Sequence, residues 1–242
     1  MTNPLHPHSP AGVVLALAGG LVFVGALGVG AIAYVWWFAV DAGPWSAPAA
    51  MRAIFVNALL FSAFALHHSA FARTGVRQWV AGRVSPDLER SIYVWVASVL
   101  FVIVCAAWRP VPGLAWRVDA PLALVLTAMQ LIGVGMSLQG ARRLDVWDLA
   151  GIRQALGRVR PRPGLVRTGL YGLVRHPVYL GWVLMVWPAP VMTGTRLTFA
   201  AISTAYLALA IPFEERTLRR EFGAEYDAYA RRTRWRMVPF LY

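Results

Sequence analysis

Charge and cysteine are scarce in this sequence of 242 residues. Charged residues make up 14% of the chain and hydrophobic residues 58%, whereas a soluble domain carries about 25% charged residues. Cys105 is the single cysteine, which excludes an intrachain disulfide, a cysteine-rich zinc site and a two-cysteine redox pair. Lysine is absent, so all 23 basic residues are arginines. The low charge and the mean hydropathy of +0.55 indicate a membrane protein.

Other missing patterns narrow the class further. The formal net charge is +12, but the arginines lie between apolar runs and not on one face of a soluble fold, so no nucleic-acid partner is expected. The first ten residues contain no arginine, and the first apolar run is too long for a cleavable signal peptide, so we expect it to remain as a helix. No Gly-x-Gly-x-x-Gly strand–turn–helix is present, which argues against a dinucleotide-binding reductase.

Six apolar runs follow one another along the chain: residues 11–40, 49–71, 91–108, 121–139, 178–192 and 196–213. A helix needs about 20 apolar residues to cross a bilayer. The last two runs are shorter and flank a turn at 193–195, which predicts a short helical hairpin. We therefore expect an all-α integral membrane protein with about six transmembrane helices. It would form one domain over 1–242, in which a four-helix membrane part (11–139) precedes a cofactor-binding part (140–242).

The distribution of arginine predicts the orientation in the membrane. With the N-terminus inside, the cytoplasmic segments hold nineteen of the 23 arginines, and four lie outside: Arg52, Arg109, Arg117 and Arg196. Because cytoplasmic loops are enriched in basic residues, we expect both termini and the active site at the cytoplasmic face of a bacterial-type inner membrane. The tail over 214–232 is predicted to form an amphipathic helix that Gly223 bends or weakens.

A first candidate site lies where the basic segment 140–177 enters the hairpin. Pro177 is well placed to begin a helix, so Arg175 and His176 would lie at its N-terminal end. A guanidinium beside free backbone N–H groups binds carboxylates and phosphates. Gly181 would let another backbone or a flat ligand approach closely. The alternative is that Arg175 and His176 only anchor the end of a span at the interface.

Glu214 and Glu215 form a second candidate site, directly after the last apolar run. Charge at the membrane edge is costly and often functional, and a carboxylate here could bind an amine, a sulfonium or an arginine. The alternative is an ordinary first polar turn after a span, in which Glu215 pairs with Arg219.

The order of these motifs resembles a known family. Arg-His-Pro-x-Tyr-x-Gly at 175–181 is followed by the apolar hairpin, by Glu214-Glu215 and by Phe-Gly-x-Glu-Tyr-x-x-Tyr at 222–229. This order is similar to that of the isoprenylcysteine carboxyl methyltransferase and phospholipid methyltransferase superfamily. The resemblance implies S-adenosylmethionine as methyl donor, with the methionyl carboxylate on Arg175 and the adenine against Tyr179. It implies a cofactor pocket formed by Tyr171, Arg175, His176, Pro177, Tyr179, Gly181, Glu214, Glu215, Tyr226 and Tyr229.

Motifs in the N-terminal half refine this resemblance. The segments at 64–73, 89–93, 108–110 and 148–154 resemble the nurim/NnrU-like branch, which includes bacterial methanethiol S-methyltransferases. The implied acceptor is a small or lipophilic thiol. His67 and His68 are candidates for accepting the thiol proton, and Glu214 is a further catalytic candidate. The alternative for the two histidines is a structural pair at the membrane interface.

The sequence leaves other functions open. One is carboxyl methylation of an isoprenylcysteine-like or other lipophilic substrate, although Ala210 and Ile211 stand where the carboxyl-methylating enzymes have an arginine. A haem or quinone protein that uses His67, His68 and His176 is another, and a non-catalytic membrane scaffold is a third. The expected partners are a small-molecule or lipid-like methyl acceptor and membrane lipids, and no metal site is expected.

Overall fold

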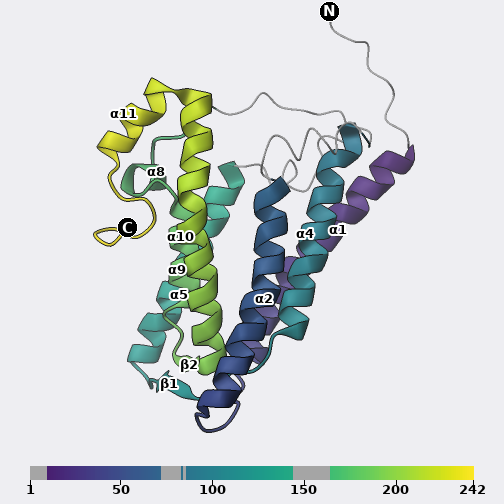
Figure 1. Ribbon diagram of the computed structural model, residues 1–242. Helices are drawn as coiled ribbons and strands as arrows, with labels where there is room; N and C mark the ends of the chain where they lie inside the picture. The colour runs from purple at the N-terminus through teal and green to yellow at the C-terminus, as the bar shows by residue number, and fades with distance from the viewer. Residues whose placement is uncertain (1–9, 72–82, 84–85, 144–163) are drawn as a thin grey trace, which may run out of the picture. The chain divides into compact units, whose positions relative to one another are not determined.

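The computed structural model describes residues 10–71, 83, 86–143 and 164–242 (Figure 1). The contacts within the chain divide it into two compact units. The first unit contains the described residues up to Ala33 and those within Leu59–Trp108. The second contains Tyr34–Ala58, Arg109–Arg143 and the described part of Arg162–Tyr242. The last two residues of the motif at 64–73 and the whole motif at 148–154 lie outside the described residues.

Four helical segments are long and apolar enough to cross a bilayer: Leu17–Trp37, Ala47–Ala70, Leu122–Gly140 and Gly194–Phe222. Two shorter apolar helices, Ile92–Ala107 and Pro177–Val186, accompany them. The prediction of an all-α membrane protein with about six apolar helices is therefore confirmed. The sequence did not predict the one two-stranded sheet that the described residues form. The expected division of the chain at residue 140 stays a prediction.

The first unit is built from α1 (Pro10–Ile32), the C-terminal half of α2 (Ala47–Phe71) and α4 (Pro86–Ala107). α1 packs closely against α4 because glycines in α1 have no side chain at the contact. A Cβ atom at Gly30 would lie 2.6 Å from the Phe101 ring, and one at Gly19 would overlap the Trp95 indole.

The second unit contains η1 (Ala33–Trp37) from Tyr34 onward, the first half of α2, β1 (Leu114–Arg117), α5 (Leu122–Arg143), α8 (Leu170–Leu173), α9 (Pro177–Val186), β2 (Val191–Thr193), α10 (Gly194–Phe222) and α11 (Ala224–Arg232). β1 and β2 pair antiparallel, with Leu114 opposite Thr193. This sheet lies at one end of the unit, and α8, α11 and the C-terminus lie at the other end (Figure 1).

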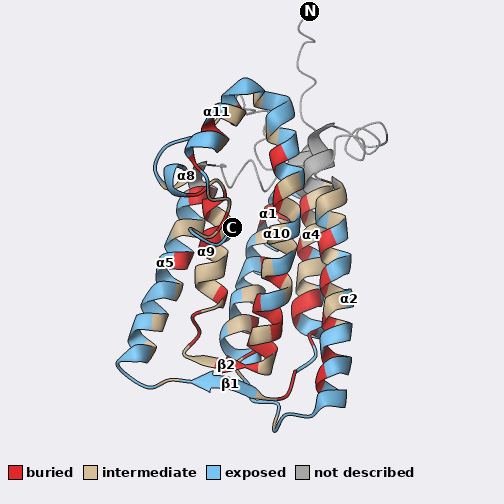
Figure 2. Cartoon of the chain, turned by 60° about the vertical axis from the view of Figure 1, so that its left-hand side comes forward, coloured by how far each residue is buried: buried red, intermediate tan, exposed pale blue. Residues whose placement is uncertain are grey.

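α5 and α9 touch through their backbones. A Cβ atom at Gly133 would lie 2.5 Å from the carbonyl oxygen of Gly181, and a Cβ atom at Gly181 would lie 2.6 Å from Ser137 Oγ. Glycine is the residue that permits such an approach between two helices. Most of α5 is otherwise exposed (Figure 2), which suits a helix in contact with lipid.

α10 is longer than the second arm of the predicted hairpin. The apolar run ends at residue 213, but the helix passes through Pro212 and continues to Phe222. Proline has no N–H and leaves the carbonyl four residues earlier without its helical donor. Here the hydroxyl group of Tyr242 donates to the Ala208 carbonyl at 3.2 Å, which satisfies that group and lets the helix continue.

Gly223 divides the predicted amphipathic helix over 214–232 into two. It ends α10 with a φ of 53°, a conformation that favours glycine. α11 then begins at Ala224, and the change of direction brings Tyr226 and Tyr229 into the interior.

Arg196 is buried in the first turn of α10, at the start of the predicted apolar run 196–213. Its Nη2 donates to the carbonyls of Tyr34 and Val35 at 3.1 Å each, and its Nη1 donates to the carbonyl of Val191 at 2.8 Å. The end of a helix leaves carbonyls without helical partners. A guanidinium has enough donors to satisfy several of them at once.

Candidate active site

The start of α9 is the centre of the candidate active site. Pro177 occupies the first position of α9 and His176 caps it, as predicted. The backbone N–H groups of Arg175 and His176 donate to the carbonyls of Trp235 and Arg236, at 2.9 and 2.8 Å. The C-terminal tail is therefore docked alongside the Arg-His-Pro motif.

Arg175 joins α10 to this tail. Its Nε donates to Glu215 Oε1 at 2.6 Å, and its Nη1 donates to the carbonyls of Thr233 and Arg234 at 2.7 and 2.9 Å. The side chain of Arg175 is 7% exposed and that of Glu215 is fully buried. A charge-assisted bond of this length in a buried site is strong, so this pair fixes three segments of the chain relative to one another.

Other cations surround the buried carboxylate of Glu215. Arg236 Nε and Arg219 Nη2 lie 3.6 and 3.8 Å from Oε2, and His176 Nε2 lies 3.6 Å from Oε1. The sequence predicted the pairing with Arg219, which the structure confirms. It gave no sign of Arg236, because this residue reaches the site through the fold of the tail and belongs to no motif.

Glu214 is the solvent-facing member of the acidic pair. Its side chain is 45% exposed, and its Oε2 accepts a hydrogen bond of 2.8 Å from the Tyr179 hydroxyl group. His176 Nδ1 lies 3.5 Å from the same oxygen. The His176 ring also stacks on the Tyr179 ring, with centroids 5.3 Å apart and an interplanar angle of 12°. The two carboxylates thus differ in role: Glu215 holds the interior together, and Glu214 can meet a ligand.

The acidic pair changes the protonation of His176. Burial by itself would lower the pKa of His176, but hydrogen bonding and charge from Glu214 and Glu215 outweigh this effect and raise the pKa above its ordinary value. The imidazole therefore keeps its proton to a higher pH than an exposed histidine does.

Two of the four candidate tyrosines, Tyr171 and Tyr229, join α8 to α11. The Tyr229 hydroxyl group donates to the carbonyl of Tyr171 at 2.8 Å. Burial raises the pKa of Tyr229 to about 12, so this hydroxyl group stays a donor. Tyr226 is fully buried and meets the Tyr229 ring edge-on at 5.9 Å. These contacts are structural, and a contact of the tyrosines with a cofactor stays a prediction.

His67 and His68 belong to the first unit, where both contact Tyr93. His68 Nδ1 lies 2.7 Å from the Tyr93 hydroxyl oxygen, and the His67 ring stacks on the Tyr93 ring at 5.9 Å. A hydrogen bond at Nδ1 orients the imidazole ring of His68. A role of either histidine in catalysis stays a prediction.

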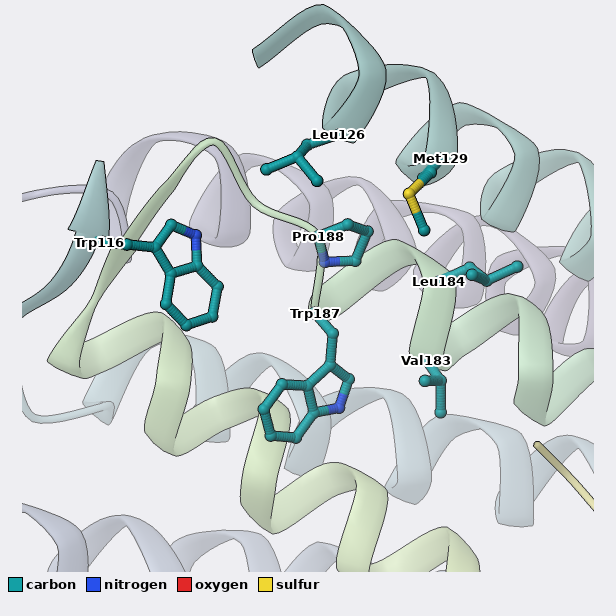
Figure 3. A pocket seen from close by; sticks show the side chains of 7 residues that line it. All are labelled: Trp116, Leu126, Met129, Val183, Leu184, Trp187 and Pro188. Carbon is teal, nitrogen blue, oxygen red and sulfur yellow. The ribbon is translucent and has the colours of Figure 1, made fainter. Parts of the chain in front are cut away.

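An apolar pocket of 560 Å³ lies between α5, α9 and β1 (Figure 3). Trp116, Trp187, Met129 and Pro188 are among its lining residues. The indole N–H groups of Trp116 and Trp187 already donate to the Ala189 carbonyl and to Thr204 Oγ1. A charged ligand needs a few placed polar groups, so this pocket does not suit a charged methyl donor.

Comparisons with known proteins identify the family. The phospholipid methyltransferase family matches residues 122–225. Methanethiol S-methyltransferase 2 of Bradyrhizobium diazoefficiens is 37% identical over 198 residues, which cover 79% of this chain and 75% of that protein. The methanethiol S-methyltransferase of Mycobacterium tuberculosis is 37% identical over 74% of this chain and 76% of its own length. Nurim of Xenopus laevis is 30% identical over 60% of this chain and 55% of its own. No solved structure matches the chain. The chain belongs to the methanethiol S-methyltransferase family of integral membrane methyltransferases.

Proposed function

We propose that this chain transfers a methyl group from S-adenosylmethionine to a small or lipophilic thiol. A methyltransferase needs a methyl donor and a small-molecule acceptor. The observation that most supports the donor site is the half-exposed carboxylate of Glu214 beside the buried pair of Arg175 and Glu215. A half-exposed carboxylate that the Tyr179 hydroxyl group holds in place can bind the ammonium or sulfonium of the donor from the solvent side.

The charges and ring faces around Glu214 fit the rest of this donor. Arg236 is 36% exposed, so its guanidinium group can bind a carboxylate. Arg175 already donates to a carboxylate and to backbone carbonyls, so we assign the methionyl carboxylate to Arg236 in its place. The stacked rings of His176 and Tyr179 offer a flat face on which an adenine can pack.

The proposed acceptor is a thiol because relatives over three quarters of this chain are named for methylation of methanethiol. When bound, S-adenosylmethionine supplies a methyl group on a sulfonium, which a thiolate attacks. The chain has to bind the thiol, remove its proton and keep water out. A thiolate is the competent nucleophile, and we propose that His68 accepts the thiol proton, with Tyr93 orienting the ring and His67 packing beside Tyr93.

We also propose that the donor site faces the cytoplasm, and that the membrane is a bacterial-type inner membrane. Nineteen of the 23 arginines then lie inside, as basic residues prefer. This orientation gives the donor site access to water-soluble metabolites. A lipophilic acceptor could enter from the lipid.

Binding of labelled S-adenosylmethionine to the purified protein in nanodiscs tests the donor site. Glu214→Gln removes one charge without changing the size of the side chain, and we expect binding at least about tenfold weaker. Glu221→Gln is the matched control, because this exposed glutamate lies on the same helix. A folded wild-type protein that binds no donor would overturn the proposal.

The acceptor is tested separately by transfer of a labelled methyl group. Methanethiol is expected to be methylated, and His68→Ala is expected to lower the rate by about 100-fold or more without changing donor affinity. Turnover of an isoprenylcysteine analogue with none of methanethiol would replace the thiol by a carboxylate as the acceptor.

A further inference from the structure

A second pocket, of 630 Å³, lies at the sheet end of the second unit, where α2 begins. Its walls come from the first turns of α2 and from residues 109–110. The proposed donor site lies at the other end of the same unit, beside α8 and α11 (Figure 1). This pocket has no part in the proposed methyl transfer.

The pocket carries two positive charges and no negative charge. Arg52 and Arg109 both line it, and no acidic side chain does. Among the described residues, neither arginine forms an ion pair with a carboxylate. The rest of the lining is largely apolar and includes Ala53 and Val56. Two guanidinium groups together with an apolar lining suit an anion that is attached to an apolar body.

The position of Arg109 is fixed by a buried side chain. Asn57 is fully buried, and its amide nitrogen donates to the carbonyl of Arg109 at 2.9 Å. The backbone N–H of Arg109 donates to the side-chain oxygen of Asn57 at 2.8 Å. Both hydrogen-bonding groups of the Arg109 backbone are thus bound to α2, which also carries Arg52. The backbones of both arginines are therefore fixed by the same helix, α2.

The pocket lies at the level where the spans of this unit end. The connections between spans are joined there, since the N–H of Gly113 donates to the Gly43 carbonyl and the N–H of Gly194 donates to the Gly113 carbonyl. Trp45 and Trp116 are exposed at the same end. Tryptophan is enriched where the bilayer meets water, at the depth of the lipid headgroups.

We infer that this pocket binds the phosphodiester headgroup of an anionic membrane phospholipid. Arg52 and Arg109 would bind the phosphate, and the apolar lining residues would contact the glycerol and the first acyl carbons. Guanidinium groups bind phosphate oxygens through charge-assisted hydrogen bonds, often two at a time.

The test uses the purified full-length protein in a phosphate-free detergent, titrated with short-chain phosphatidylglycerol, with bound lipid counted by native mass spectrometry. The test variant carries Arg52→Gln and Arg109→Gln together. Both side chains are exposed, so this variant should keep the fold, and thermal unfolding checks that it does. Arg117→Gln is the matched control, because Arg117 is an exposed arginine on β1 that does not line the pocket.

We expect the double variant to bind phosphatidylglycerol at least about tenfold more weakly and Arg117→Gln to bind it as the wild type does. A diacylglycerol, which lacks the phosphate, should not compete. Equal losses in both variants would show that general positive charge attracts the lipid and would overturn the inference. Inorganic phosphate that binds as tightly as the lipid would also overturn it, because the site would then recognise a free anion.

Discussion

Arg175 and Glu215 form a buried ion pair between the start of α9 and the polar end of α10, with Nε 2.6 Å from Oε1. The pair is central because Nη1 of the same guanidinium binds the carbonyls of the C-terminal tail. Glu214, the residue immediately before Glu215, is thereby held with its carboxylate half-exposed. The geometry of the proposed donor site therefore depends on the Arg175–Glu215 pair, whose side chains are buried.

Glu215→Gln should destabilise the protein strongly, because it leaves the buried Arg175 without its counter-charge. Removal of one partner from a buried pair costs about 3–5 kcal/mol. Glu225→Gln is the control: its pair with Arg167 is about half exposed on both sides (53% and 47%), and such pairs contribute about 0–1 kcal/mol. Thermal unfolding in detergent measures both, and equal effects would contradict the central role of Glu215.

The raised pKa of His176 predicts a dependence of stability on pH. A group whose pKa is raised on folding stabilises the protein fully below its ordinary value of 6.5 and loses this effect as the pH rises through the folded value. Wild type should therefore exceed His176→Gln in free energy of unfolding by more at about pH 6 than at about pH 9. A difference that is constant or grows with pH would refute the stated charge coupling.

Gly133→Ala should destabilise the contact of α5 with α9. The added Cβ would lie 2.5 Å from Gly181 O and 2.7 Å from Met185 N, both of which are backbone atoms that cannot turn away. Overpacking of this kind costs about 1–3 kcal/mol. At Gly135, on the same helix, a Cβ would meet nothing within 4 Å, so Gly135→Ala should be neutral or stabilising. A lower melting temperature for Gly133→Ala alone would show that close packing against α9 is the cause. Equal losses in both variants would mean that α5 tolerates no added side chain at either position.

Tyr242→Phe should cost about 1 kcal/mol, because it removes the donor to the Ala208 carbonyl. Pro212→Ala provides the control, since alanine restores the N–H that a helix would direct at that carbonyl. The cost of Tyr242→Phe should therefore be smaller in the Pro212→Ala background, as a double-mutant cycle measures. An unchanged cost would mean that the tyrosine stabilises the protein by another contact.

The sequence predicts what depends on local pattern. Hydropathy located the apolar helices, and the proline rule located the start of α9 at Pro177. The paired acids and the Arg-His-Pro motif were recognised as neighbours, and the structure places them within hydrogen-bonding range. The motif predicted that Arg175 binds a ligand, and it did not predict the hydrogen bonds of Arg175 to the carbonyls of the C-terminal tail.

Contacts between distant segments could not be predicted in this way. Arg196 binds carbonyls of η1 that lie about 160 residues earlier in the chain, and its position between two apolar runs gives no sign of this. Arg236 joins the site because the tail pairs with residues 175 and 176. Hydropathy and motif spacing describe each segment by itself, whereas these bonds depend on the packing of several segments.

The contact of α5 with α9 has a consequence for changes of specificity. Side chains in a packed site can adjust by moving between rotamers, but two backbones in contact at Gly133 and Gly181 have no such freedom. The position of α9 along the axis of α5 is therefore fixed, and so is the position of its N-cap residue, His176. Variants selected for bulkier methyl acceptors should gain space through α10 or the tail and should retain both glycines.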